Sequence, residues 1–285
     1  MPAPRATGWA VPRAVAALSW LLASSPVPAA CAGDIDSAPD PGASSAAAAG
    51  QPGSAAPWSY NLGLFSQYVS RGISYTHEQP AVQATALYSA PSGAYVGFWL
   101  SNVSAAYVHG GTLETDPFGG FAGSAGDLGY DLGFWRWTFI GASLPVSRQK
   151  YDTVELYVGL SWKRLSVKLW REITDYFGVD DRSARADFGL APNGSSRGSR
   201  YLEGAWTFDL SRGYALGLHA GRQSVHGYSR LDFSDYRVNL DKEFGSGYLA
   251  SVSYSWTTAA PELYLDLRGQ NASRPKWVAY VKKSF

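Results

Sequence analysis

The sequence has little of what marks a helical membrane protein or a nucleic-acid-binding protein. It contains one cysteine and one methionine, and no apolar run approaches the roughly 20 residues that a membrane-spanning helix needs. Lys plus Arg (24) and Asp plus Glu (23) nearly cancel, so the net charge of +1 gives no electrostatic case for binding nucleic acid. No His-Glu-x-x-His motif occurs. We expect no metal, no cofactor and no catalytic residue.

The abundant residues are those of strands and tight turns. The chain holds 31 Gly, 18 Tyr and 11 Trp, which favours many short strands over helices. The mean hydropathy is slightly negative. This does not exclude a membrane protein, because the polar lumen residues of a barrel strand offset its lipid-facing residues in any average.

The N-terminal segment has the pattern of an export signal. Residues 1–32 carry basic residues, then a short apolar core over Ala14–Ala23, then small residues at Ala30–Ala32. Residues 33–57 are rich in Ala, Pro, Gly and Ser, which predicts a disordered periplasmic tether. The remaining domain, residues 58–285, is then exported through the periplasm of a Gram-negative bacterium.

From Trp58 onward, apolar and polar residues alternate with the period of a β-strand. This alternation predicts twelve strands, at 58–69, 81–90, 94–103, 112–123, 128–139, 153–162, 165–172, 199–208, 214–223, 236–244, 248–256 and 277–285. Pro117 is the only proline inside a predicted strand, and it weakens the fourth.

The lengths of the connections alternate as well. Every second connection, counted from the first hairpin, is very short, and the others are long. A soluble barrel or sandwich has no reason to sort its loops in this way, whereas a barrel threaded from the periplasm does. The sequence therefore predicts an all-β fold: a single antiparallel up-and-down transmembrane β-barrel with short periplasmic turns and longer extracellular loops.

The last strand carries a second sign of this fold. Trp277, Val281 and Phe285 fall on one side of it, and the chain ends on the aromatic residue. A terminal Phe on an amphipathic strand is the signal that the barrel-insertion machinery reads in outer-membrane barrels. We expect this strand to close the barrel against the first strand.

Six cations interrupt the apolar faces of the predicted strands. Four fall near the outer strand ends, Arg136, Arg171, Arg200 and Arg222, and two near the inner ends, Lys242 and Lys283. A lipid-facing cation costs about 2–4 kcal/mol at mid-depth but little at an interface. The four arginines are candidates for contact with lipopolysaccharide phosphates, and simple snorkelling explains them equally well.

The opposite faces would line the lumen. The predicted pore-lining residues are Asp131, Glu155, Lys168, Glu172, Glu203, His219, Arg237, Asp241 and Lys282. With Glu114 and Asp116 the inward set holds seven acids and three bases besides the histidine, which favours cations. Many inward aromatic residues predict a narrow pore, or one partly blocked by the loop at 173–198. Asp131 with Lys168, and Asp241 with Arg237 or Lys282, could equally be paired charges in a packed interior.

Several short motifs, in this order and spacing, resemble the TorF family of porins. They are Gln67–Ser74, Tyr130–Phe134, Thr174–Gly178, Ser234–Val238 and the terminal Lys283–Phe285. The resemblance runs from Trp58 to Phe285. It implies a small outer-membrane barrel with channel activity and no established substrate.

The predicted function is passive diffusion of small polar solutes, cations among them, across the outer membrane. The partners expected are outer-membrane lipid and lipopolysaccharide, the barrel-insertion machinery during assembly, and small solutes. One alternative is a structural or adhesive barrel without a conducting pore. A less favoured one is an outer-membrane hydrolase, since His77, His109 and His226 fall in or beside outer loops and only His219 faces the lumen.

Overall fold

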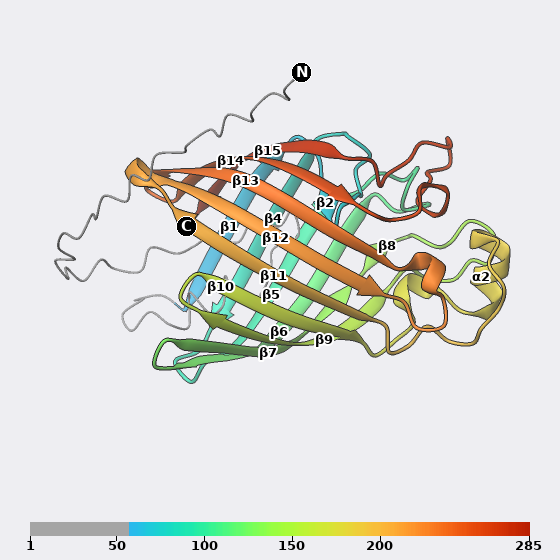
Figure 1. Ribbon diagram of the computed structural model, residues 1–285, viewed down its shortest axis with the longest axis horizontal. Coiled ribbons are helices and arrows are strands. Elements are labelled where there is room, and N and C mark those ends of the chain that lie inside the picture. Colours follow the sequence, from blue (N-terminus) through green and yellow to red (C-terminus); the bar gives the residue numbers. More distant parts are fainter. Residues whose placement is uncertain (1–56) are drawn as a thin grey trace, which may run out of the picture. The chain divides into compact units, whose positions relative to one another are not determined.

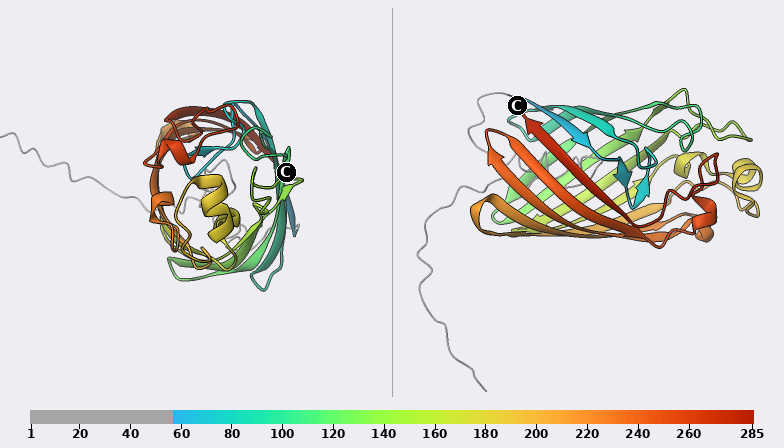
Figure 2. Two further views of the ribbon diagram at one scale, coloured as in Figure 1. Left: turned by 90° about the vertical axis from the view of Figure 1, so that its right-hand side faces the viewer. Right: turned by 90° about the horizontal axis from the view of Figure 1, so that it is seen from above.

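Residues 57–285 are described by a computed structural model, and they form one closed antiparallel β-barrel (Figures 1 and 2). The predicted signal peptide and almost all of the predicted tether lie outside the described residues. Twelve long strands build the wall: β1 (Trp58–Phe65), β4 (Ala81–Ser89), β5 (Ala94–Asn102), β6 (Leu113–Ala125), β7 (Leu128–Trp137), β9 (Thr153–Trp162), β10 (Leu165–Glu172), β11 (Arg200–Asp209), β12 (Tyr214–Ser224), β13 (Phe233–Gly245), β14 (Tyr248–Thr257) and β15 (Lys276–Ser284).

The other elements are short and lie in the connections. They are β2 (Val69–Ser70), β3 (Ile73–Ser74), β8 (Phe139–Ile140), α2 (Asp181–Phe188) and the 3₁₀ turns η1 (Tyr176–Gly178), η2 (Ser211–Gly213), η3 (Ser229–Leu231) and η4 (Pro261–Leu263). No helix within residues 57–285 is long and apolar enough to cross a membrane.

The barrel closes by pairing its first and last strands. β1 lies antiparallel to β15, with Leu64 opposite Val281 and Phe65 opposite Tyr280, and each remaining strand pairs with its neighbour along the chain. The predicted closing pair is therefore confirmed. The first strand ends at Phe65 rather than at residue 69: Ser66 still bonds the backbone of β15, and beyond it the chain leaves the wall and forms the hairpin of β2 and β3.

The connections are sorted by length between the two ends, as predicted. Residues 90–93, 126–127, 163–164, 210–213 and 246–247 make short turns at one end, here called the turn end. The long connections, with α2 among them, lie at the other end, the loop end (Figure 1). This arrangement is that of an up-and-down barrel.

The two faces of the wall differ in exposure as the alternation predicts. Outward residues such as Leu64 and Val281 are apolar and exposed, at 63% and 53%, whereas the inward Trp99 is 1% exposed. A continuous apolar outer band of this kind would be unfavourable in water and suits a lipid environment.

Pro117 lies inside β6, as expected, and the chain compensates for it locally. The register of β6 is the same on both sides of the proline, with Phe118 opposite Trp135 and Glu114 opposite Phe139. Because proline has no N–H to donate, the backbone ladder is interrupted here. The Asp116 carboxylate accepts a hydrogen bond from the Thr138 N–H at 3.0 Å and bridges the gap.

Inward glycines make room for aromatic rings from neighbouring strands. Gly133 lies opposite Tyr157, and an ideal Cβ on Gly133 would lie 2.5 Å from the tyrosine Oη. Gly120 and Tyr95 are related in the same way. The glycines thus allow large rings to lie flat across the barrel wall and fill the lumen.

Candidate functional site in the barrel lumen

A small hairpin, residues 69–74, lies inside the barrel near its loop end. β2 and β3 pair with Val69 opposite Ser74, and the turn between them is Arg71-Gly72, both with positive φ. Positive φ at both central residues is the geometry of a tight two-residue hairpin turn, and glycine adopts it without strain. The hairpin therefore projects the Arg71 side chain from its tip.

The hairpin is fixed to the wall by contacts at its base and along one side. The Lys276 ammonium group donates to the carbonyl oxygens of Gly72 and Ala272, at 2.8 and 2.7 Å. Gln67 donates from its side chain to the Trp277 carbonyl oxygen at 2.9 Å. Ile73 packs in an apolar cluster with Phe233, Ala259, Tyr264 and Ala272.

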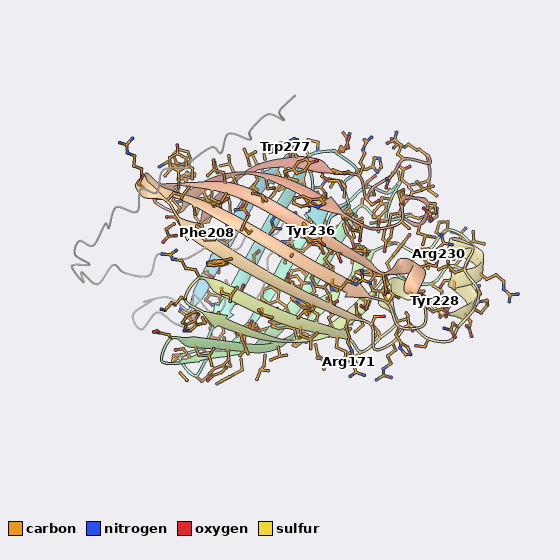
Figure 3. The ribbon with its side chains drawn as sticks, in the orientation of Figure 1. Arg171, Phe208, Tyr228, Arg230, Tyr236 and Trp277 are labelled. Carbon is orange, nitrogen blue, oxygen red and sulfur yellow. The ribbon has the colours of Figure 1, made fainter. Side chains whose placement is uncertain are left out.

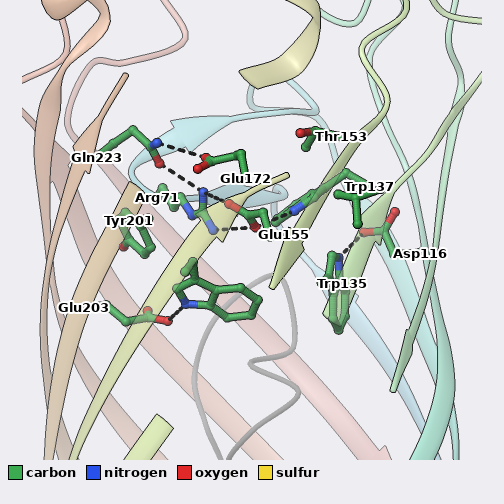
Figure 4. A network of polar contacts seen from close by, with 12 residues as sticks. Arg71, Asp116, Trp135, Trp137, Thr153, Glu155, Glu172, Tyr201, Glu203 and Gln223 are labelled. Atoms are coloured by element: carbon green, nitrogen blue, oxygen red, sulfur yellow. Dashed lines mark hydrogen bonds and ion pairs between the residues drawn. The ribbon is translucent and has the colours of Figure 1, made fainter. Parts of the chain in front are cut away.

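Arg71 crosses the lumen to the opposite wall (Figure 4). Its guanidinium group donates two hydrogen bonds of 2.9 Å to the two carboxylate oxygens of Glu155 on β9, and a third of 3.1 Å to Gln223 on β12. Its Cζ lies 4.0 Å from the ring centroid of Tyr201. A bidentate pair of this kind is short, directional and strong. Arg71 thereby joins the hairpin to strands more than 80 residues away in the sequence.

Other buried polar side chains extend this network. Trp137 donates its indole N–H to Glu155 at 2.7 Å, and Gln223 donates to Glu172 at 3.1 Å. On the neighbouring strands, Asp116 accepts the indole N–H of Trp135 at 2.9 Å. Indole and amide donors thus hold one or both oxygens of Asp116, Glu155 and Glu172, whereas the buried Glu172 Oε2 has no hydrogen-bond partner in the described part of the chain.

A second polar cluster lies beside the first. His219 Nε2 lies 3.0 Å from Asp235 Oδ1, and the Tyr201 hydroxyl donates to Asp235 at 3.0 Å. His219 Nδ1 lies 3.8 Å from Glu203, which accepts the Trp170 indole N–H at 2.6 Å. Aromatic donors again hold the inward carboxylates in place.

The layer of side chains around the hairpin is tightly packed. Glu114, Asp116, Glu155, Glu172 and Gln223 are all 0% exposed although they carry polar groups that face the lumen. Tyr68 at the base of the hairpin is also fully buried and donates to Glu114 at 3.3 Å. Water therefore does not reach these side chains in this conformation.

The turn end of the lumen is less crowded beside β9, β10 and β11. The inward residues there are small and half-buried, namely Ser161, Ser166, Ala205 and Thr207. On other strands, Leu87, Tyr95 and Leu249 are large and buried at the same end. The turn end is thus more accessible along one side of the barrel than the layer around the hairpin.

The predicted pore-lining residues all face the lumen. Asp131, Glu155, Lys168, Glu172, Glu203, His219 and Asp241 are buried, and Arg237 and Lys282 are half-buried. The Asp131–Lys168 pair forms, with 3.7 Å between the charged groups, and Asn239 donates to Asp241 at 3.1 Å. The alternation along the strands thus places these residues on the inward face, and their role as the lining of a pore stays a prediction.

The residues of the network that the sequence analysis missed include Arg71, Gln223 and Asp235. Asp235 belongs to β13, which starts at Phe233 rather than at residue 236. Arg71 lies in a connection that reads as an outer loop. Its one local signal is the Arg-Gly pair between two short β-prone pairs, which is a hairpin-turn pattern.

The loop at 173–198 lies at the mouth of the barrel, so the partial block of the pore by this loop stays a prediction. α2 lies beyond the strands in Figure 1 and over the opening in the end-on view of Figure 2. Phe177 of this loop contacts Trp137, with 5.7 Å between the ring centroids. The loop covers the mouth, and the β2–β3 hairpin fills the lumen beneath it.

One pattern in this loop, Gly194-Ser195-Ser196-Arg197-Gly198, has the Gly-x-Ser-x-Gly spacing of hydrolase nucleophile elbows. In such an elbow the serine hydroxyl is exposed at a strand-to-helix turn. Here Ser196 is 0% exposed, donates to the Val179 carbonyl oxygen at 2.5 Å and accepts the Tyr176 N–H at 2.8 Å. These bonds occupy the hydroxyl in a structural role.

The outward cations lie where the sequence analysis places them. Arg136, Arg171, Arg200 and Arg222 are exposed at the loop ends of their strands, and Figure 3 shows Arg171 pointing away from the barrel. Lys242 and Lys283 lie at the turn end, over the rings of Tyr214 and Tyr248 at 4.5 and 4.4 Å. Trp277, Val281 and Phe285 are exposed on the outer face of the closing strand.

Comparison with known proteins gives a family and several structures of similar architecture. No curated protein matches the sequence. The KdgM porin shares 10% identity over 80% of this chain and 99% of its own, with a TM-score of 0.49. The NanC porin shares 10% identity over 80% and 98% of the two chains, with a TM-score of 0.48. OprD of Pseudomonas aeruginosa shares 12% identity over 80% of this chain and 66% of its own, with a TM-score of 0.36.

The family match rests on the sequence itself. Residues 49–285 match the family described as "Bacterial protein of unknown function (Gcw_chp)", whereas the resemblance to TorF-family porins is not confirmed by the match. The matched segment includes every strand of the barrel. The chain belongs to the Gcw_chp family.

Proposed function

We propose that the protein is an outer-membrane channel for small polar solutes, with a preference for cations, and that the β2–β3 hairpin closes its lumen. The observation that carries this proposal is the hairpin itself, held inside a closed twelve-strand barrel by the Arg71–Glu155 pair. The apolar outer band supports a membrane location, and the polar interior supports a path for solutes rather than for lipid.

The cation preference follows from the charges around the hairpin. The loop half of the lumen holds six carboxylates, Glu114, Asp116, Glu155, Glu172, Glu203 and Asp235, and four bases, Arg71, Lys168, Arg237 and Lys276. A passage lined with carboxylates raises the local concentration of cations and excludes anions. Moving Arg71 out of this layer would increase the excess of negative charge at the narrowest level.

Opening would require the hairpin to move, and its contacts allow this. The hairpin's two strands are two residues each, and its tip is held by polar groups, while Val69 and Ile73 at its sides pack in apolar clusters. Water or a permeating cation can replace hydrogen bonds to carboxylates at modest cost, whereas burial of a large apolar segment would be harder to reverse. Hairpin displacement is thus the proposed opening step.

The location and export route are part of the same proposal. A Gram-negative outer membrane suits a barrel with short turns on one side and long loops on the other. Residues 1–32 would direct export through the periplasm. Trp277, Val281 and Phe285 would then be read by the barrel-insertion machinery, since all three are accessible on the outer face.

Single-channel recording in planar bilayers tests the proposal. Replacing Val69–Ser74 with two glycines should raise both the conductance and the time spent open, and the reversal potential in a salt gradient should show cation preference. In the control variant, Asp181–Phe188 is replaced in the same way, which shortens a loop outside the barrel. A folded hairpin-deleted barrel that stays silent would contradict the channel function, and an anion-selective one would contradict the charge argument.

One observation favours a second function, a structural barrel without a pore. The polar side chains of the hairpin layer are fully buried, which is typical of a packed interior. In that case the Arg71–Glu155 pair would serve folding alone. The hairpin deletion separates the two functions, because a structural barrel would lose thermal stability without gaining conductance.

A further inference from the structure

Two outward arginines lie directly opposite each other on neighbouring strands. Arg171 of β10 is the register partner of Arg200 of β11, and both side chains are exposed on the outer face near the loop end. Arg222 of β12 lies diagonally next to Arg200, since it pairs with Leu202. Three guanidinium groups are therefore gathered on three consecutive strands.

The central pair has no countercharge, unlike the cations around it. Arg136 lies 3.8 Å from Asp152, and Arg222 lies 3.4 Å from Asp232. Within residues 57–285, no carboxylate comes within salt-bridge distance of Arg171 or Arg200. Like charges directly opposite each other on a sheet destabilise it. A ligand that neutralises both arginines would remove this repulsion.

The surface beneath the pair is apolar. Leu169 and Leu202 are register partners one step further along β10 and β11 toward the turn end, and both are exposed, as is Val158 of β9, the partner of Leu169. A ligand that matches the whole patch has an anionic group for the guanidinium forks and hydrocarbon chains for the leucines. A free anion would match only the arginines.

We propose that Arg171 and Arg200 bind one phosphate group of a phosphorylated membrane lipid, with Arg222 at the edge of the site. Guanidinium forks suit phosphate oxygens, and two forks from adjacent strands can approach one phosphate from two sides. The acyl chains then lie along Leu169, Leu202 and Val158. The occupant is a lipid of the leaflet that faces the loop end, and lipopolysaccharide carries such phosphates.

The test measures lipid bound to the intact barrel. The full-length chain is produced with its own N-terminal segment, purified in detergent and titrated with three probes: a bisphosphorylated acylated glucosamine disaccharide, the same lipid without phosphates, and inorganic phosphate. Native mass spectrometry counts the molecules bound. The variants are Arg171→Gln with Arg200→Gln, and the matched control Lys242→Gln with Lys283→Gln, which removes two outward cations at the turn end.

We expect the double arginine variant to bind the phosphorylated lipid about tenfold or more weakly, because each charge-assisted hydrogen bond contributes roughly 1.5–3 kcal/mol. The control variant should bind as the parent does. Arg171→Lys with Arg200→Lys keeps the charge but loses the forks, so it should bind with intermediate affinity. The lysine variant also replaces the glutamine variant in this test if the glutamine variant does not show the heat-modifiability of a folded barrel.

Three results would overturn the proposal. The first is equal binding by the parent and both arginine variants. The second is that the parent chain binds the phosphate-free lipid as tightly as the phosphorylated lipid, which would show that the apolar surface alone holds the lipid. The third is inorganic phosphate binding as tightly as the lipid, which would identify the patch as a site for a free anion.

Discussion

Replacing Arg71 with glutamine should release the hairpin from the far wall of the barrel. The substitution removes two 2.9 Å hydrogen bonds to Glu155, one of 3.1 Å to Gln223 and the contact with the Tyr201 ring. Glu155, which is 0% exposed, would keep only the Trp137 indole donor. Removing one partner of a buried ion pair costs about 3–5 kcal/mol, because the other charge is left buried and unpaired.

This free energy acts on the equilibrium between inserted and displaced hairpin. Since each 1.4 kcal/mol is a factor of ten, the ratio of inserted to displaced hairpin should fall by about a hundredfold to several thousandfold. In planar bilayers, Arg71→Gln should open far more often than the parent. The double variant Arg71→Gln with Glu155→Gln should differ less in thermal stability from the parent, because no unpaired buried charge remains.

The control for this prediction is an ion pair at the surface. Arg230 and Glu262 approach to 2.7 Å with side chains 63% and 58% exposed, so Arg230→Gln should change stability by about 1 kcal/mol at most and leave opening unchanged. If Arg71→Gln opens no more often than Arg230→Gln, and its unfolding midpoint is that of the parent, Arg71 does not hold the hairpin and the reasoning is refuted.

Three further predictions concern the loop end, the lumen packing and the chain terminus. Asp180 accepts the N–H groups of Arg182 and Ser183 at the start of α2. Burial raises the pKa of Asp180, but these hydrogen bonds outweigh it and lower the pKa below its usual value. The cap therefore stabilises α2 at neutral pH, and this stabilisation is lost as the pH falls through the lowered pKa. Asp180→Ala should destabilise α2 by about 1 kcal/mol at pH 7, seen as faster amide exchange, and an unchanged exchange rate would contradict the capping role. Gly133→Ala should lower the free energy of unfolding in urea by about 1–3 kcal/mol, because the new Cβ would meet the Tyr157 hydroxyl. The control Gly204→Ala should be tolerated, because the atom nearest to its new Cβ lies 3.6 Å away. Equal urea midpoints for the two variants would show that the Tyr157 ring moves freely. Phe285→Ala should leave stability nearly unchanged, since the ring is 69% exposed, but should slow assembly into the outer membrane in cells, and normal assembly would argue against a terminal signal.

The wall of the barrel could be predicted from the sequence because its rules are local. Alternation fixes which residues face outward, and turn length fixes which end each connection occupies, so neither requires knowledge of distant contacts. Phe65 shows where this reasoning stops. Alternation continues past it to residue 68, but after Ser66 the chain leaves the wall, and Tyr68 is buried in the lumen with its N–H bonded to Thr76 and its hydroxyl to Glu114.

The interior could be predicted as a set of residues but not as a network. The alternation along the strands places Glu155 and Glu172 in the lumen. Their partner Arg71, however, lies 84 residues from Glu155 in a segment with no long strand. Its importance depends on the path of the whole connection, which no periodic pattern encodes. The same limit applies to the Arg171–Arg200 pair, since strand ranges alone do not give the register that places them side by side.

The position of Arg71 at the tip of the hairpin has an electrical consequence. A positive charge attached to a movable segment inside the barrel lies within the electric field applied across a membrane, whereas its partner Glu155 is fixed to the wall. Moving one elementary charge through the full field changes the free energy by about 2.3 kcal/mol per 100 mV. A voltage that drives cations toward the loop end would pull the hairpin outward, and the opposite voltage would press it against Glu155. Barrels inserted in a single orientation should therefore open more often at one polarity than at the other, and this difference should disappear when Arg71 is neutralised.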